Sequence, residues 1–300
     1  MAYLLGLAQC ASCMDKEENL RKARQFAEKA KAAGVGLLVF PENFMMPYEA
    51  EKDAFLQAAE GLDGPFAEGM GAIAREFGLW MVFCMIEKPG AEGKSCEDAD
   101  GRAVTDIVIR ERGKNAEELQ EQVSSSNKNR TYNTAVLMDD RGTIQSIYHK
   151  THVYDAFGER ESDRFIPGEK LPDVVETPFG KIALGICYDL RFPELARLSA
   201  LAACDLLIYP AAWVRGDHKS LHWQTLLTAR AIENGIFIAG CSYVDHKYLG
   251  ESRIIDPYGE TVAAGGGQEE LIVGEVDPDM VREAQARSLT LANRRDDLYG

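Results

Sequence analysis

Short apolar runs alternate with segments of helical periodicity along most of this chain. A first helix is expected between the capping residue Asp15 and the stop at Gly34. The expected strands cover residues 1–9, 35–40, 79–87, 181–187, 206–210, 236–242, 252–256, 260–264 and 270–276, and further helices cover residues 65–77, 193–203 and 220–234. Alternation of this kind predicts an α/β fold in which helices cover a mostly parallel or mixed sheet. No linker interrupts it, so residues 1–300 are expected to form a single domain.

One polar segment, at about residues 90–130, departs from this pattern. It lies between Pro89 and Asn129 and surrounds a small apolar stretch, Val104–Ile109. Its high polarity predicts a mobile surface insertion. It could cover a pocket, lie in an oligomer interface, or do neither.

Charge and cysteine content exclude several classes of partner. The chain carries 33 basic and 48 acidic residues, a formal net charge of −15, and no basic run. Nucleic acid and anionic membranes both require a basic patch, so neither is expected as a partner.

The apolar run at the N-terminus is too short for a signal peptide or a membrane span. Seven cysteines, an odd number, argue against a disulfide framework and favour a cytoplasmic location. The lone Cys10–Cys13 pair lacks the second pair that a structural metal site needs, so no metal is expected.

Three apolar runs end in chemically different groups. Glu42 follows the run that begins at Leu37, Lys150 follows the run that begins at Gln145, and Cys187 ends the run that begins at Lys181. In open α/β sheets, catalytic groups gather at the C-terminal ends of strands. We therefore expect this carboxylate, ammonium and thiol to meet in one pocket.

Cys187 stands where a buried strand runs into a polar turn, with Pro193 opening a helix just beyond it. A helix N-terminus and nearby cations lower a thiol's pKa to roughly 3.5–7.5, which makes a nucleophilic thiolate. A free cysteine at a strand end is more often a buried structural residue. Glu42 and Lys150 are what favour the nucleophile.

These residues lie in motifs that resemble the nitrilase superfamily of carbon–nitrogen hydrolases. The longest match is GICYDLRFPE at Gly185–Glu194. Further matches are Pro41–Glu42, His149–Lys150, Arg130–Ala135, Tyr209–Trp213, Ala229–Asn234 and Asp297–Gly300. The resemblance implies a four-layer αββα sandwich, a homodimer or higher homo-oligomer, and a Glu42–Lys150–Cys187 triad.

The resemblance also implies how the triad works. Glu42 would take the thiol proton and later donate it to the departing nitrogen, while Lys150 and the backbone N–H of Tyr188 would hold the oxyanion. Glu161 matches the family's second glutamate, which orients the substrate amide and Lys150, although Glu159 is a near neighbour. This cycle uses no metal and no cofactor.

The substrate implied is a small amide. Within the superfamily the chain looks most like the ω-amidases and deaminated-glutathione amidases, which act on compounds such as 2-oxoglutaramate or succinamate. A distal carboxylate would need a guanidinium or hydroxyl to receive it. The substrate-binding candidates near the predicted rim are Tyr48, Tyr188, Arg191, Trp213 and Arg215.

Several alternatives remain open at this point. An N-carbamoyl hydrolase would use the same triad on a ureido carbon. Nitrile hydrolysis is disfavoured because the pair Cys187–Tyr188 differs from the Cys-Trp-Glu typical of nitrilases. A catalytically silent binding protein would be expected to lose a triad residue. A Cys-His hydrolase would instead activate the thiol with His149 or His152.

Overall fold

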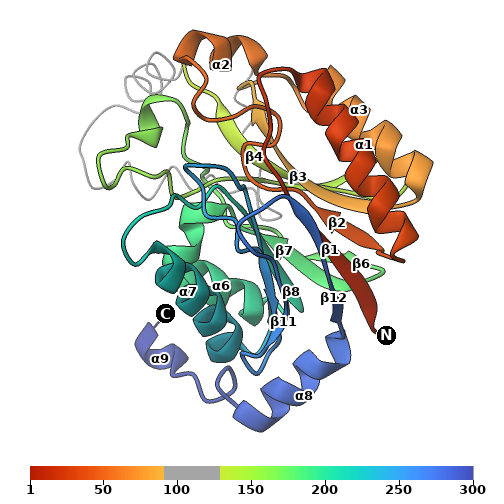
Figure 1. Cartoon of the computed structure of the whole chain (residues 1–300). Helices are drawn as coiled ribbons and strands as arrows, with labels where there is room; N and C mark the ends of the chain where they lie inside the picture. The colour runs from red at the N-terminus through yellow and green to blue at the C-terminus, as the bar shows by residue number, and fades with distance from the viewer. Residues whose placement is uncertain (91–128, 300) are drawn as a thin grey trace.

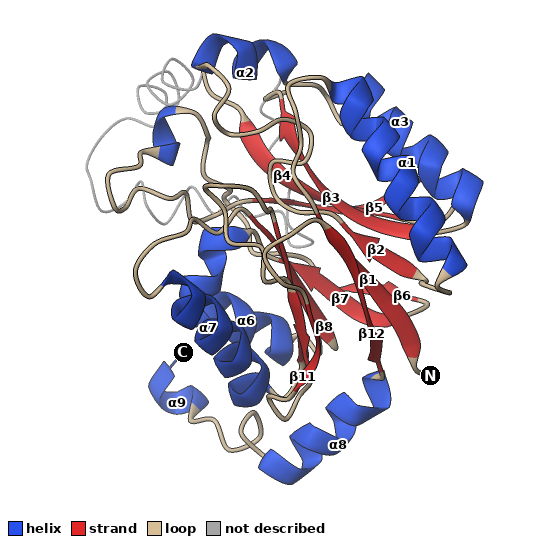
Figure 2. Cartoon of the chain, viewed as in Figure 1, coloured by secondary structure: helices blue, strands red, loops and turns tan. Residues whose placement is uncertain are grey.

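The computed structural model describes residues 1–90 and 129–299, which form two six-stranded sheets with helices on their outer faces (Figures 1 and 2). The insertion expected at about 90–130, with its apolar stretch Val104–Ile109, lies almost entirely outside the described residues. The first sheet has the order β12-β1-β2-β3-β4-β5 and the second has the order β11-β10-β9-β8-β7-β6.

The two sheets repeat one pattern of strand directions. In each, three neighbouring strands are parallel, and an antiparallel strand pairs with each side of this group. A sixth strand then pairs antiparallel with one of these two outer strands. The first sheet contains β1 (Tyr3–Gln9), β2 (Leu37–Val39), β3 (Trp80–Glu87), β4 (Tyr132–Met138), β5 (Ile144–His149) and β12 (Glu270–Val276). The second contains β6 (Val175–Thr177), β7 (Gly180–Leu184), β8 (Leu206–Ala211), β9 (Phe237–Ser242), β10 (Arg253–Ile255) and β11 (Thr261–Ala264).

Helices cover the outer faces of both sheets. Figure 2 shows α1 and α3 beside the first sheet and α6 and α7 beside the second. The α-helices are α1 (Lys16–Ala32), α2 (Lys52–Ala58), α3 (Pro65–Phe77), α6 (Pro193–Leu201), α7 (Lys219–Asn234), α8 (Pro278–Ser288) and α9 (Asp296–Tyr299), and the 3₁₀ helices are η1 (Glu161–Asp163) and η2 (Cys187–Arg191). As expected, the Asp15 side chain caps α1 by accepting the N–H of Glu17. Within the described part of the chain, no helix is both long and apolar enough to cross a membrane.

Strand β2 shows why the fold has four layers. Leu37 and Val39 point into the core between the two sheets, whereas Leu38 packs with the helices that cover the first sheet. Successive side chains of a strand point to opposite faces, so a strand that is apolar throughout must be covered on both sides. The predicted four-layer αββα sandwich is confirmed.

The segment around Cys187 differs from the prediction. The expected strand over residues 181–187 ends at Leu184, and Cys187 begins η2 instead. Cys187 has a φ of +45°, in the left-handed region that residues other than glycine seldom adopt. The sulfur therefore projects from a tight turn, and α6 begins only at Pro193.

Candidate active site

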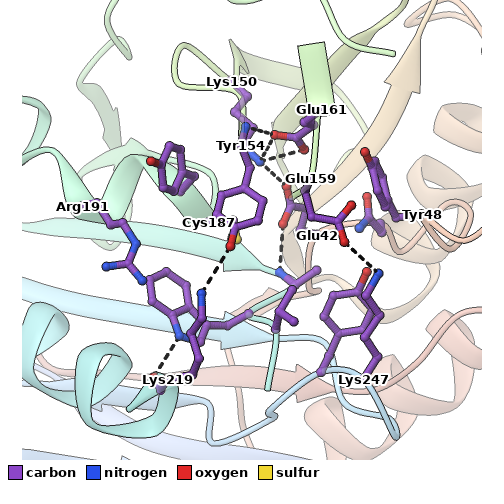
Figure 3. A pocket seen from close by; sticks show the side chains of 16 residues that line it. Glu42, Tyr48, Lys150, Tyr154, Glu159, Glu161, Cys187, Arg191, Lys219 and Lys247 are labelled. Atoms are coloured by element: carbon purple, nitrogen blue, oxygen red, sulfur yellow. Dashed lines mark hydrogen bonds and ion pairs between the residues drawn. The ribbon is translucent and has the colours of Figure 1, made fainter. Parts of the chain in front are cut away.

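A pocket opens where the C-terminal ends of β2, β5, β7 and β8 come together (Figure 3). Its volume is about 50 Å³, which is room for a few water molecules or a small amide. The lining includes the three groups expected to meet, Glu42, Lys150 and Cys187, together with Glu161. Each comes from a different segment: Glu42, Lys150 and Cys187 follow β2, β5 and β7, and Glu161 lies on η1.

Lys150 lies between two carboxylates. Its Nζ is 2.8 Å from Glu42 Oε1 and 2.8 Å from Glu161 Oε2, and all three side chains are buried. Burial alone would lower the pKa of Lys150, but Glu161 and Glu42 outweigh it and hold this pKa well above its ordinary value. The ammonium is therefore a fixed positive charge that a developing oxyanion could use.

Glu42 is held by three hydrogen bonds, two of which the sequence did not reveal. Asn133 Nδ2 and Lys150 Nζ each donate to Glu42 Oε1 at 2.8 Å, and the backbone N–H of Ala212 donates to Oε2 at 2.8 Å. The carboxylate also acts electrostatically on Cys187. Asn133 and Ala212 lie within Arg130–Ala135 and Tyr209–Trp213, two of the motifs that match the nitrilase superfamily. These motifs were the sequence signal that could have identified the two residues.

The prediction that the pKa of the Cys187 thiol is lowered is wrong. Burial raises the pKa of the Cys187 thiol well above its ordinary value, the Glu42 carboxylate raises it further, and Lys150 only partly offsets both. The turn that carries Cys187 is short, and no long helix begins at the sulfur. The thiol is consequently protonated at neutral pH, so a nearby base has to remove its proton.

The turn itself is fixed by one buried carboxylate. Asp189 Oδ2 accepts the backbone N–H of Ile186 at 2.9 Å and the hydroxyl of Tyr148 at 2.9 Å. Asp189 Oδ1 lies 2.7 Å from His152 Nδ1 and accepts the backbone N–H of His152 at 3.1 Å. These contacts tie the turn that carries Cys187 to the segment after β5.

The two histidines of the Cys-His alternative have other partners. His149 Nε2 lies 2.9 Å from Glu87, and its ring stacks on Tyr132. His152 stacks on Phe192, with 3.6 Å between ring centroids, and bonds Asp189. Among the residues the structure describes, neither histidine lines the pocket that holds Cys187. The geometry favours Glu42 as the base.

The neighbouring glutamates Glu161 and Glu159 contact different lysines. Glu161 reaches Lys150 on the pocket floor, whereas Glu159 lies at the mouth, 3.7 Å from Lys247. Burial raises the pKa of Glu161, Lys150 opposes this shift, and Glu42 adds to it. The family resemblance therefore selected the glutamate that contacts Lys150.

The substrate-binding candidates divide in the same way. Tyr48, Tyr188, Arg191 and Trp213 line the pocket. Arg215 is exposed, and it is not among the described residues that form the lining. Tyr188 packs edge-on against Tyr154 and Phe192. The lining also includes residues that the sequence did not reveal, among them Tyr154, Lys219, Lys247 and Tyr248.

In the described part of the chain, no group of three or more His, Cys, Asp or Glu side chains is placed to hold a metal ion. The pocket's acidic side chains are already engaged with lysines.

Comparisons with known proteins agree with this geometry. Residues 4–286 match the family model for carbon-nitrogen hydrolases. A deaminated glutathione amidase from Escherichia coli O157:H7 is 32% identical over 294 residues, 97% of each chain. The omega-amidase NIT2 of Xenopus tropicalis is 29% identical over 307 residues, 99% of this chain and 96% of that protein.

A solved structure shows the same fold. The crystal structure of Saccharomyces cerevisiae Nit3, a member of branch 10 of the nitrilase superfamily, superposes with a TM-score of 0.76 at 27% identity. The match covers 98% of this chain and 97% of that one. With the family model spanning nearly the whole sequence, the chain belongs to the carbon–nitrogen hydrolase family.

Proposed function

We propose that this protein is an amidase that releases ammonia from a small ω-amide through a thioester on Cys187. The observation that carries the proposal is the buried Lys150 between Glu42 and Glu161 in the pocket that holds the thiol. These groups supply a base, an oxyanion-stabilising cation and a nucleophile, which is the set that acyl transfer needs.

The reaction begins with proton transfer from the Cys187 thiol to Glu42. The sulfur attacks the amide carbon, a C–S bond forms, and the carbonyl electrons move to the oxygen, held by Lys150 Nζ and the backbone N–H of Tyr188. Glu42 then returns its proton to the nitrogen, the C–N bond breaks, and ammonia leaves. Water, deprotonated by Glu42, hydrolyses the thioester and frees the acid and the thiol. Glu161 orients Lys150 throughout.

The substrate class rests on the relatives. Proteins named deaminated glutathione amidase and omega-amidase match almost the full chain. We propose compounds of the succinamate or 2-oxoglutaramate type as substrates. An N-carbamoyl amino acid is the second candidate, because the same triad could attack a ureido carbon.

Ammonia release from succinamate, 2-oxoglutaramate, an N-carbamoyl amino acid and an aliphatic nitrile tests the proposal. The expected result is fastest release from an ω-amide, with an acyl adduct at Cys187 seen by intact mass. Cys187→Ala should abolish both signals. Cys13→Ala removes an exposed thiol outside the pocket and should keep them. Turnover by Cys187→Ala would overturn the assignment.

We also propose a cytoplasmic homodimer or higher homo-oligomer. All six cysteines in the described part of the chain are free thiols. Leu198 and Leu201 on α6 and Leu221 and Ile232 on α7 are exposed apolar side chains on the helices that cover the second sheet. Apolar surface of this kind favours association. Light scattering should show an oligomer that Leu221→Glu with Ile232→Glu dissociates, and a monomeric wild type would contradict the proposal.

A further inference from the structure

The mouth of the pocket holds two cations that the described part of the chain does not neutralise. The lining contains four basic and three acidic side chains, although the chain as a whole is strongly acidic. All three lining carboxylates are taken by lysines on the floor and on one side of the mouth. Arg191 and Lys219 form no ion pair with any carboxylate in the described residues.

Trp213 holds these two cations together. The Arg191 guanidinium lies over the Trp213 ring, 4.8 Å from its centroid, and Trp213 Nε1 donates to the Lys219 backbone carbonyl at 2.9 Å. Lys219 Nζ lies 4.1 Å from the centroid of the Phe157 ring and donates to the Tyr154 hydroxyl at 3.2 Å. Aromatic packing thus fixes both charges without cancelling them.

The arrangement is unfavourable until an anion arrives. Burial and the adjacent guanidinium lower the pKa of Lys219, which shows that the two positive charges oppose each other. Arg191 Nε is buried without a hydrogen-bond partner among the described residues. A carboxylate between them would supply an acceptor and relieve the repulsion.

The other side of the mouth lacks this property. Lys247 Nζ is 3.2 Å from Glu49 and 3.7 Å from Glu159, so its charge is already balanced. Figure 3 places Arg191 and Lys219 on one side of the pocket and Lys247 on the other. An anionic substrate group is therefore attracted to one side only.

We propose that Arg191 and Lys219 form a subsite for the carboxylate at the far end of the substrate, and that this subsite selects anionic ω-amides over neutral amides. The inference rests on the proposed amidase function and extends it from the reacting amide to the opposite end of the molecule. Lys219, on the first turn of α7, acts as a specificity-determining residue and takes no part in bond breaking.

The test compares succinamate with levulinamide, in which a neutral acetyl group replaces the carboxylate. Wild type should favour succinamate in kcat/KM by about 10- to 100-fold, the effect of a charged hydrogen bond. Lys219→Met should remove about tenfold of this preference, mainly through KM, and Lys219→Arg should restore it. Lys247→Met is the matched control and should preserve the succinamate-to-levulinamide ratio.

Each outcome decides the matter. A wild-type ratio near one, or a ratio that Lys219→Met leaves unchanged, overturns the subsite while the amidase assignment stands. If no amide is hydrolysed, the proposed function fails, and calorimetric binding of succinate decides the subsite alone. Succinate should then bind wild type and Lys219→Arg but not Lys219→Met, and equal binding by all three overturns the subsite.

Discussion

Lys150 and Lys219 both line the pocket, but the protein surrounds the two ammonium groups in opposite ways. Lys150 is buried at the floor and contacts two carboxylates at 2.8 Å. Lys219 is partly exposed at the mouth and contacts aromatic rings and a tyrosine hydroxyl. The neighbours raise the pKa of Lys150, whereas burial and Arg191 lower the pKa of Lys219.

This difference separates chemistry from selection. The charge of Lys150 is balanced within the protein, so it is in place before any ligand binds and costs no reorganisation during the reaction. Among the residues that the structure describes, no carboxylate balances the charge of Lys219, so its energetic effect depends on the ligand that enters the pocket. Substitutions around Lys150 and substitutions of Lys219 should therefore change different measured quantities.

The largest effect is expected at the floor from Glu42→Gln. The amide keeps the shape of the side chain and can still accept the Ala212 N–H, but it cannot take the Cys187 proton. Because the pKa of this thiol is raised, turnover should fall by about 10²- to 10⁴-fold. Ammonia release and the rate of iodoacetamide alkylation of Cys187 both measure the loss.

Glu159→Gln is the matched control for that variant, since this carboxylate contacts Lys247 at the mouth. It should lower turnover far less. Full activity of Glu42→Gln together with loss of activity in His152→Ala would instead support the Cys-His mechanism.

Lys150→Met should break both stability and turnover. It leaves Glu42 and Glu161 buried together without a cation, and breaking such a pair costs about 3–5 kcal/mol. Losing an oxyanion donor should lower kcat by about 10²- to 10³-fold. Urea unfolding and steady-state kinetics measure the two effects.

The same urea experiment on Lys219→Met sharpens the comparison. Within residues 1–90 and 129–299, Lys219 has no carboxylate partner that the substitution would leave unpaired. The free energy of unfolding of this variant should therefore change by only about 0.5 kcal/mol. Equal destabilisation by the two variants would mean that Lys219 is a structural cation as well.

Much of the pocket floor could be predicted because its residues lie in recognisable local sequence patterns. Glu42, Lys150 and Cys187 each follow an apolar run, and the geometry of parallel strands brings such ends together. Glu161 was identified by its match to the second glutamate of the family. The confirmed four-layer fold was implied by the family resemblance, and strands that are apolar on both faces account for it in the structure.

The mouth and the thiol's environment depend on contacts between distant segments. Lys219 opens a helix in the second half of the chain, and only the folded structure places it beside Arg191 and Tyr154. The predicted low pKa of Cys187 was wrong because burial, set by tertiary packing, outweighs the local turn. The strand predicted to reach Cys187 ends early because Asp189 accepts the N–H of Ile186.

The smallest effect is a pH dependence of selectivity. Since the pKa of Lys219 is lowered and that of Lys150 is raised, increasing pH should discharge Lys219 first. Burial raises the pKa of Tyr154, the hydroxyl that Lys219 contacts, so this tyrosine stays protonated over the same range. The succinamate-to-levulinamide ratio of kcat/KM should therefore fall a few-fold at alkaline pH while Lys150 stays charged. Lys219→Arg should flatten the profile, because a guanidinium stays charged throughout. An equal fall in that variant would assign the titration to another group.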